Sequence, residues 1–239
     1  MGTVSDDIQT RMRAMGSEAQ AAHLSRFFKT GKGEYGEGDR FLGIKVPETR
    51  LLVKEFRKRA ALDDIENLTR SPWHEARLAG FLLLIELFKK AKDRRQIVDY
   101  YLSVIERGNN WDLVDLVAPK ILGEWLLEHP EERGVLYELA AMDGYLWHQR
   151  VAVVSCWTII RAGDYDDTMR LSELLMNHRH DLIHKATGWM LREVGKRGGI
   201  GRLRSFLDAH AAEMPRTMLR YSIERLPDEE RKRYMSLGK

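Results

Sequence analysis

The sequence has almost no cysteine, and the one it has lies among apolar residues. Cys156 is the single cysteine of 239 residues, and it falls within the apolar run 151–160. A lone thiol excludes a disulfide scaffold and any metal site built from several cysteines. We therefore expect a buried structural thiol, which is typical of a protein of the reducing cytoplasm.

The sequence also lacks a long uncharged apolar stretch and a strong excess of either charge. No segment approaches the roughly 18 apolar residues of a membrane span, and the first seven residues carry neither a basic nor an apolar leader region. Secretion and membrane insertion are therefore not expected. Lys+Arg 39 against Asp+Glu 36 gives a formal net charge of +3. An argument for a nucleic-acid partner must therefore rest on where the charges lie.

Signals for β-strands are nearly absent, whereas helix-forming residues are abundant. There is no sustained alternation of period two and no Asn-Gly hairpin, and Leu, Ala, Glu, Arg and Lys are frequent. With 44% hydrophobic and 31% charged residues, the chain has the composition of a globular protein that can bury a core. No break in composition divides it, so we predict one all-α domain over residues 1–239.

A repeat with a period near 37 residues organises the predicted helices. Segments 73–79 and 147–152 resemble each other at an offset of 74 residues, Trp111 lies between them, and His184 follows His148 by 36 residues. Each copy opens an apolar helix of about 12 to 16 residues, preceded by a more polar helix and a short turn such as 62–64 or 162–164. Such antiparallel helix pairs resemble HEAT-type or tetratricopeptide units. They predict a right-handed superhelical solenoid with one concave face that forms a groove.

A Gly-rich charged segment departs from this repeat. Residues 30–40 contain four glycines among charged side chains and precede Phe41-Leu42-Gly43-Ile44. The segment does not match the pattern of a phosphate-binding P-loop. Two interpretations are open: a flexible connector between the N-terminal helices and the repeats, or a mobile loop at the rim of the groove.

Trp111 and Asp115 are the first candidate functional residues. They stand four residues apart, which places an indole and a carboxylate on one face of a helix. Leu113, Leu116 and Val117 lie on the other side at about 100° per residue, so Trp111 and Asp115 face away from the apolar stripe of their own helix. A Trp in that position either packs on a neighbouring helix or contacts a ligand.

A second candidate surface is a cationic stripe on a helix predicted from Leu182 to about Lys196. Lys185, Trp189, Arg192 and Lys196 lie within about 60° of one another at 3.6 residues per turn. Residues 182–204 contain six Lys or Arg and one acidic residue, Glu193. A cationic stripe around an aromatic suits a phosphate backbone. The alternative is a solvated helix face with one stray Trp.

Arg150 is the third candidate, because it opens a long apolar run. A guanidinium in such surroundings requires a carboxylate or phosphate partner. Asp115, in the adjacent repeat, is the carboxylate candidate. The two partners are compatible, since Arg150 could pair with Asp115 in the empty protein and hold a phosphate when a ligand is bound.

Motifs of other chemistries are missing. The sequence contains no H-E-x-x-H, no G-x-S-x-G, no Walker A motif and no G-x-G-x-x-G after a strand. His74, His148 and His184 recur at the repeat period, which favours roles at helix starts or in packing over metal binding. We expect neither a metal nor a cofactor.

In this order and spacing, the motifs resemble the bacterial alkylpurine DNA glycosylases of the AlkD type. The resemblance rests on segments 109–115, 146–150 and 183–193, and it extends to Phe41-Leu42-Gly43-Ile44 with Pro47. It implies a HEAT-like array whose concave basic surface holds duplex DNA. It also implies removal of N3- and N7-alkylated purines without extrusion of the base into a pocket.

The resemblance also implies roles for individual residues. Trp111 and Trp189 match the aromatics that pack against the sugar and backbone of the damaged nucleotide. Asp115 matches the catalytic carboxylate, and Arg150 matches an arginine that contacts phosphate. Lys45 stands where the family can place a different polar residue, and we include it among the candidate DNA contacts with Lys185, Arg192 and Lys196.

The resulting hypothesis is a monofunctional DNA glycosylase for base excision repair. Its partner would be double-stranded DNA containing alkylated purines, and a monomer is expected because a curved array that encloses DNA has no need to self-associate. A Schiff-base lyase step through Lys185 is less favoured, since a lysine in a cationic stripe more commonly contacts phosphate. The alternative is a non-catalytic HEAT-like module that binds nucleic acid or protein.

Overall fold

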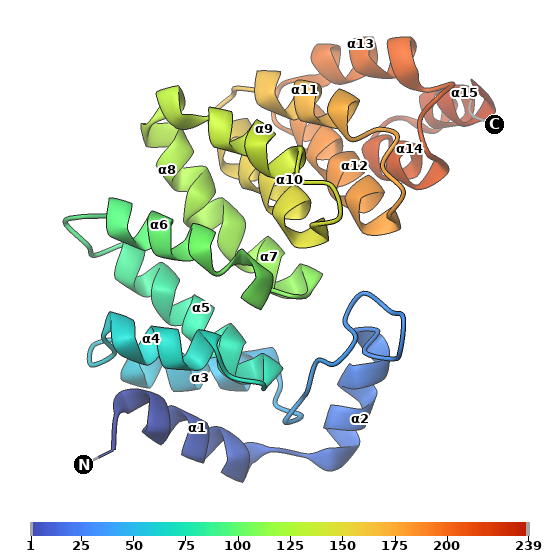
Figure 1. The fold of residues 1–239 in the computed structure, drawn as a ribbon. Coiled ribbons are helices and arrows are strands. Elements are labelled where there is room, and N and C mark those ends of the chain that lie inside the picture. The colour runs from blue at the N-terminus through green and yellow to red at the C-terminus, as the bar shows by residue number, and fades with distance from the viewer. Residues whose placement is uncertain (1, 238–239) are drawn as a thin grey trace. The chain divides into compact units, whose positions relative to one another are not determined.

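The computed structural model describes residues 2–237, which form helices and loops with no β-strand among them (Figure 1). This confirms the predicted all-α helical-repeat fold. The chain forms two compact units, an N-terminal unit up to Leu113 and a C-terminal unit from Val114 onward. The single domain over residues 1–239, the superhelical curvature and the concave groove stay predictions.

The N-terminal unit has its core around one long helix, α5. Its helices are α1 (Val4–Met15), α2 (Glu18–Phe27), α3 (Val46–Phe56), α4 (Leu62–Thr69), α5 (His74–Phe88) and α6 (Arg95–Ser103). Helix α5 is buried on almost every side, including Ala79, Leu84 and Phe88 at 0% exposure. It packs against α3, α4 and α6. A helix that is apolar all round requires partners on several faces, which these three helices supply.

The junction between the two units lies within α7 (Trp111–Val117), between Leu113 and Val114. The C-terminal unit continues with a 3₁₀ turn, η2 (Ala118–Lys120), α8 (Leu122–Glu128), α9 (Gly134–Ala140), α10 (Leu146–Arg161), α11 (Asp166–Leu174), α12 (Asp181–Lys196), α13 (Ile200–His210), α14 (Arg216–Ser222) and α15 (Asp228–Leu237). Helix α12 packs against α10 and α14, and α9 and α11 pair with α10 and α12 (Figure 1).

The predicted repeat is confirmed at the level of helix starts. The apolar helix of each copy begins at His74, Trp111, Leu146 and Asp181, at spacings of 37, 35 and 35 residues. The helices that precede them are α4, α6, α9 and α11, and each is shorter than the helix it precedes except α6, which has 9 residues against the 7 of α7. The helix predicted from Leu182 to about Lys196 is confirmed as α12, with Ile183, Met190 and Leu191 at 0% exposure on its inner side.

Two sequence predictions are wrong in detail. Helix α7 has 7 residues instead of the expected 12 to 16, because Pro119 lacks an amide hydrogen and the backbone continues as η2 before α8 begins. Residues 62–64 are not a turn before a helix but the first turn of α4. Its acidic residues Asp63 and Asp64 lie at the helix start, where carboxylates are stabilising. The turn at 162–164 does follow the end of α10.

The lone thiol lies where the sequence predicts it. Cys156 is in α10 at 1% exposure, and burial raises the pKa of its thiol to about 12. It is therefore protonated and unreactive at neutral pH. None of the helices in the described part of the chain is long and apolar enough to cross a membrane.

Candidate active site

Asp115 and Arg150 form a bidentate ion pair in the C-terminal unit. Nε of Arg150 donates to Oδ1 of Asp115, and Nη2 donates to Oδ2, each at 2.8 Å. Two parallel hydrogen bonds fix the plane of the carboxylate as well as its position, which a lysine ammonium cannot do. The partner predicted for Arg150 in the empty protein is therefore confirmed.

The two members of this pair differ in their access to solvent. The side chain of Arg150 is 5% exposed, whereas that of Asp115 is 20% exposed. The remaining terminal nitrogen of Arg150, Nη1, donates to the carbonyl oxygen of Leu182 in the first turn of α12 at 2.6 Å. Buried Arg150 thus links α7, α10 and α12 through its hydrogen bonds. In the ion pair, solvent reaches the carboxylate of Asp115. A phosphate contact by Arg150 stays a prediction.

Trp111 stands one helical turn before Asp115 on α7, and its indole lies partly exposed in the N-terminal unit. Its ring centroid lies 5.4 Å from that of Phe28 and 6.0 Å from that of Phe27. Phe27, at the end of α2, is itself 55% exposed. The indole therefore packs on neighbouring rings, as one of the two alternatives predicts, and a ligand contact through its exposed part stays a prediction. The sequence analysis did not identify Phe27 or Phe28.

The residues around the start of α7 are held by buried polar groups. Nδ2 of Asn110, a side chain at 0% exposure, donates to the carbonyl oxygen of Phe28 at 3.1 Å. Oδ1 of Asn110 accepts from the backbone N–H of Trp111 at 2.9 Å. Asn110 thereby ties the first residue of α7 to the end of α2. This accounts for the asparagine directly before the tryptophan.

His74, the first residue of α5, holds the next residue of α7. Its Nδ1 lies 2.8 Å from Oδ2 of Asp39, and its Nε2 lies 2.9 Å from Oδ2 of Asp112. Burial opposes the charged imidazolium, but Asp112 and Asp39 outweigh that effect and raise the pKa of His74 to about 9. At neutral pH the ring is protonated and donates to both carboxylates. The packing role expected of His74 at a helix start is confirmed.

Arg77 completes the buried charge network around Asp39. Its Nη2 donates to Oδ1 of Asp39 at 2.6 Å and to Oδ1 of Asn109 at 2.8 Å. Burial alone would raise the pKa of Asp39, but hydrogen bonding to His74 and the charge of Arg77 lower it overall. Asp39, near the end of the Gly-rich segment, is thus fixed by the cationic side chains of His74 and Arg77.

The Phe41-Leu42-Gly43-Ile44 motif is fixed by a buried carboxylate. Glu75, 2% exposed, accepts from the backbone N–H groups of Leu42, Gly43 and Ile44 at 2.8, 2.8 and 3.1 Å. Gly43 has φ 84°, and a Cβ there would lie 2.1 Å from the carbonyl oxygen of Ser17. The motif is therefore structural in this chain. Lys45 follows it, exposed directly before α3, and its DNA contact stays a prediction.

The cationic stripe predicted on α12 is present, and its members differ in their partners. Lys185 is half-exposed and pairs with Asp181 at 2.8 Å from Nζ to Oδ2, whereas Arg192 pairs with Glu224. Lys196 is exposed and has no ion pair among the described residues. Trp189, which lies between Lys185 and Arg192 along α12, is partly exposed.

The one acidic residue of segment 182–204 is withdrawn from that surface. Glu193 is 5% exposed, and its carboxylate lies 3.5 Å from Nε of Arg197 and 3.6 Å from Nη2 of Arg192. Its charge is therefore taken up inside the protein by neighbouring guanidinium groups. Asp181 and Glu224 therefore offset part of the positive charge on the outward face of α12, and Lys196 adds a charge with no such partner among residues 2–237.

One group of side chains in residues 2–237 has the types and spacing of metal ligands. His129, Glu131 and Glu132 bring their ligand atoms within 4.8 Å of one another after α8. Glu132 accepts from Nε1 of Trp125 at 2.9 Å, and the ring of His129 lies 3.8 Å from that of Trp125. These contacts explain the cluster as a structural cap on α8, and we assign no metal to it.

The chain is similar to known proteins in sequence family and in fold. A family model described as DNA alkylation repair enzyme matches residues 8–226. Among solved structures, a predicted DNA alkylation repair enzyme from Enterococcus faecalis is similar to this chain with a TM-score of 0.73 at 20% sequence identity. The similarity covers 90% of this chain and 98% of that one. No curated protein matches the sequence. On the extent of the family match, the chain belongs to the DNA alkylation repair enzyme family.

Proposed function

We propose that the chain is a monofunctional DNA glycosylase. It hydrolyses the N-glycosidic bond of N3- and N7-alkylated purines in duplex DNA, without base flipping, as the first step of base excision repair. One observation carries the proposal: Asp115 is a partly exposed carboxylate that buried Arg150 holds in a fixed plane. Membership of a DNA alkylation repair family supports the same class of substrate.

The chemistry requires little more than a well-placed carboxylate. A purine alkylated at N3 or N7 is already cationic, so it leaves without a general acid, and the barrier lies in the oxocarbenium-like sugar. At an effective dielectric constant near 20, a carboxylate about 4 Å from that cation contributes roughly 4 kcal/mol, on the order of a thousandfold in rate. Because Arg150 offsets part of the field of Asp115, this is an upper bound.

Arg150 also serves the geometry of the reaction. A carboxylate that stabilises a cation or orients a water molecule must point in one direction, and its cost of reorganisation is lowest when that direction is fixed beforehand. The bidentate pair fixes Asp115, and the bond to the carbonyl oxygen of Leu182 fixes Arg150 in turn. In this proposal Asp115 is the catalytic residue and Arg150 positions it.

The two tryptophans would contact the sugar and backbone of the damaged nucleotide. Both indoles are partly exposed, and Trp111 shares α7 with Asp115 at a spacing of one helical turn. The faces of aromatic rings attract cations, which favours the charged sugar of the transition state. Lys185, Arg192 and Lys196 would bind phosphates along α12, and Lys45 is a further candidate from the N-terminal unit.

The proposal is tested by incubating the purified protein with duplex DNA treated with a methylating agent and separating the released bases by chromatography. We expect free 7-methylguanine and 3-methyladenine above the spontaneous rate. Duplex DNA containing uracil, whose base is uncharged, should release nothing. DNA binding without any base release would instead indicate the non-catalytic helical-repeat module.

A further inference from the structure

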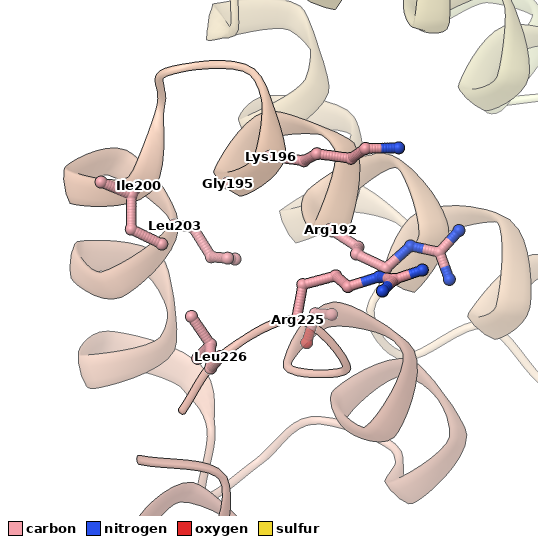
Figure 2. A pocket seen from close by; sticks show the side chains of 8 residues that line it. Arg192, Gly195, Lys196, Ile200, Leu203, Arg225 and Leu226 are labelled. Carbon is pink, nitrogen blue, oxygen red and sulfur yellow. The ribbon is translucent and has the colours of Figure 1, made fainter. Parts of the chain in front are cut away.

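A pocket at the end of α12 gathers cations from two separate parts of the sequence. It has a volume of about 370 Å³, and Arg192 and Lys196 of α12 line it together with Arg225, which follows α14 (Figure 2). The cationic ends of these three side chains extend to the same side in Figure 2. Apolar side chains line the opposite side, namely Ile200, Leu203 and Leu226.

The positive charge of this pocket is incompletely balanced. Glu224 and the buried Glu193 both pair with Arg192. Lys196 and Arg225 are exposed, and neither forms an ion pair within residues 2–237. Cations that border one pocket repel one another, so an anion bound between them gains from all of them. The three side chains, which we call the Arg225 cluster, therefore form a candidate anion site.

The Arg225 cluster is held by closely packed helices. Gly188 of α12 lies against α14, where a Cβ would approach the carbonyl oxygen of Met218 to 2.5 Å. The absence of a side chain allows this contact, and α12 and α14 pack along each other in the C-terminal unit. Arg225 lies three residues beyond the end of α14, in the turn before α15, and this packing brings that turn to the end of α12. Sites carried on such rigid elements hold their geometry better than sites on long loops.

The length of the cationic stripe on α12 favours an extended anion as the ligand. At a rise of 1.5 Å per residue, the stripe from Lys185 to Lys196 on α12 extends over roughly 16 Å. Phosphates of one DNA strand advance about 3.4 Å each along the duplex axis, so the stripe is about as long as a run of five of them. A single small anion would occupy only one end. The row of cations therefore fits a nucleic-acid backbone.

We propose that the Arg225 cluster binds backbone phosphates of the DNA that flanks the lesion. Arg192 and Lys196 follow Trp189 by three and seven residues on α12, which corresponds to roughly 4 and 10 Å along the helix. The bound phosphates would then lie about one to three nucleotides from the nucleotide that Trp189 contacts. This inference rests on the proposed function for the identity of the ligand, and it adds Arg225 to the DNA contacts.

The first test measures the salt dependence of binding to undamaged fluorescein-labelled duplex DNA by fluorescence anisotropy. Replacing Arg225 with Ala should lower the slope of log K against log salt by about 0.9, since one phosphate contact is lost. Arg225→Lys should restore most of the slope, because lysine also neutralises a phosphate. Arg192→Ala should lower the slope by about one unit as well.

Arg220→Ala is the matched control for Arg225→Ala. Arg220 is an exposed arginine of α14 that lines a different pocket with Asp228 and Arg231. Its removal changes the net charge equally, and the slope should stay at the wild-type value. An unchanged slope for Arg225→Ala, or an equal decrease in both variants, would overturn the site.

A second test locates the contact. A set of duplexes is prepared, each with one lesion and one neutral methylphosphonate linkage. The linkage stands at one of the first four positions on either side of the lesion, in one strand or the other. At the position that the Arg225 cluster binds, the neutral linkage should weaken binding by the wild-type protein but not by Arg225→Ala, since the two changes remove the same interaction. If every linkage weakens both proteins equally, Arg225 binds no flanking phosphate.

The two proposals fail separately. Release of methylated bases by the wild-type protein, combined with wild-type binding by Arg225→Ala, would retain the glycosylase and discard the Arg225 cluster. Loss of slope in Arg225→Ala, combined with no base release by the wild-type protein, would retain the DNA site and discard the glycosylase.

Discussion

At the scale of single residues, Arg150 is the candidate whose partners the structure defines in full. The resemblance assigns it to a phosphate, whereas the structure uses its Nε, Nη1 and Nη2 groups on Asp115 and on the carbonyl oxygen of Leu182. A buried guanidinium with these partners acts on the carboxylate first. Its action on DNA would come through the direction it gives to Asp115.

Arg150→Lys separates the two roles, because lysine binds phosphate but cannot form a bidentate pair with a carboxylate. If Arg150 positions Asp115, base release measured in single turnovers should fall on the order of 10- to 100-fold, while affinity for the duplex changes little. Arg150→Ala should in addition destabilise the fold by about 3–5 kcal/mol, since it leaves the partner groups unpaired. A loss of affinity with normal single-turnover rates would instead assign Arg150 to a phosphate.

At the scale of elements, the start of α7 is the best-anchored feature of the N-terminal unit. Asn109 is held by Arg77, Asn110 by the end of α2, and Asp112 by His74. Trp111 stands among them against two phenylalanines. An element that carries a candidate substrate contact is thus fixed before any ligand binds, which is how preorganised sites reduce the cost of binding.

The charge of His74 makes this anchoring dependent on pH. The folded-state pKa of about 9 lies above the ordinary value of 6.5, so protonated His74 stabilises the fold fully below pH 6.5. That stabilisation should decrease between pH 6.5 and 9 and be absent at higher pH, a change of roughly 3 kcal/mol. Denaturant unfolding at pH 6.5, 8 and 9.5 measures the decrease.

His74→Gln is the control for this prediction. The variant should be less stable than the wild type at pH 6.5, and its free energy of unfolding should change much less over the same pH range. Parallel curves for the two proteins would show that His74 is not the group that titrates.

At the scale of the whole molecule, the sequence predicts what depends on local periodicity. The repeat near 37 residues, the buried face of α12 and its outward stripe all follow from helical spacing, and the structure confirms them. The pairing of Arg150 with Asp115 was also predictable, because an isolated guanidinium in an apolar run requires a carboxylate from a neighbouring repeat. These features need only helix geometry and the stacking of adjacent repeats.

The remaining features depend on contacts that no local pattern encodes. His74 meets Asp39 because the Gly-rich segment folds back on α5, and Arg225 reaches the end of α12 because α12 and α14 pack closely. Pro119 indicates in the sequence that α7 is short, but the prediction followed the apolar periodicity instead. The asparagines before Trp111 indicate where α7 begins, since Asn is favoured before helix starts.

The most direct test of the whole account is release of 7-methylguanine from methylated duplex DNA by Asp115→Asn. Asparagine keeps the shape of the side chain and removes its charge, so the account predicts a fall in the single-turnover rate of up to about a thousandfold, with duplex binding retained. Asp63→Asn, the same change at an exposed carboxylate of α4, should release base at close to the wild-type rate. Wild-type release kinetics in Asp115→Asn would contradict the catalytic role of Asp115.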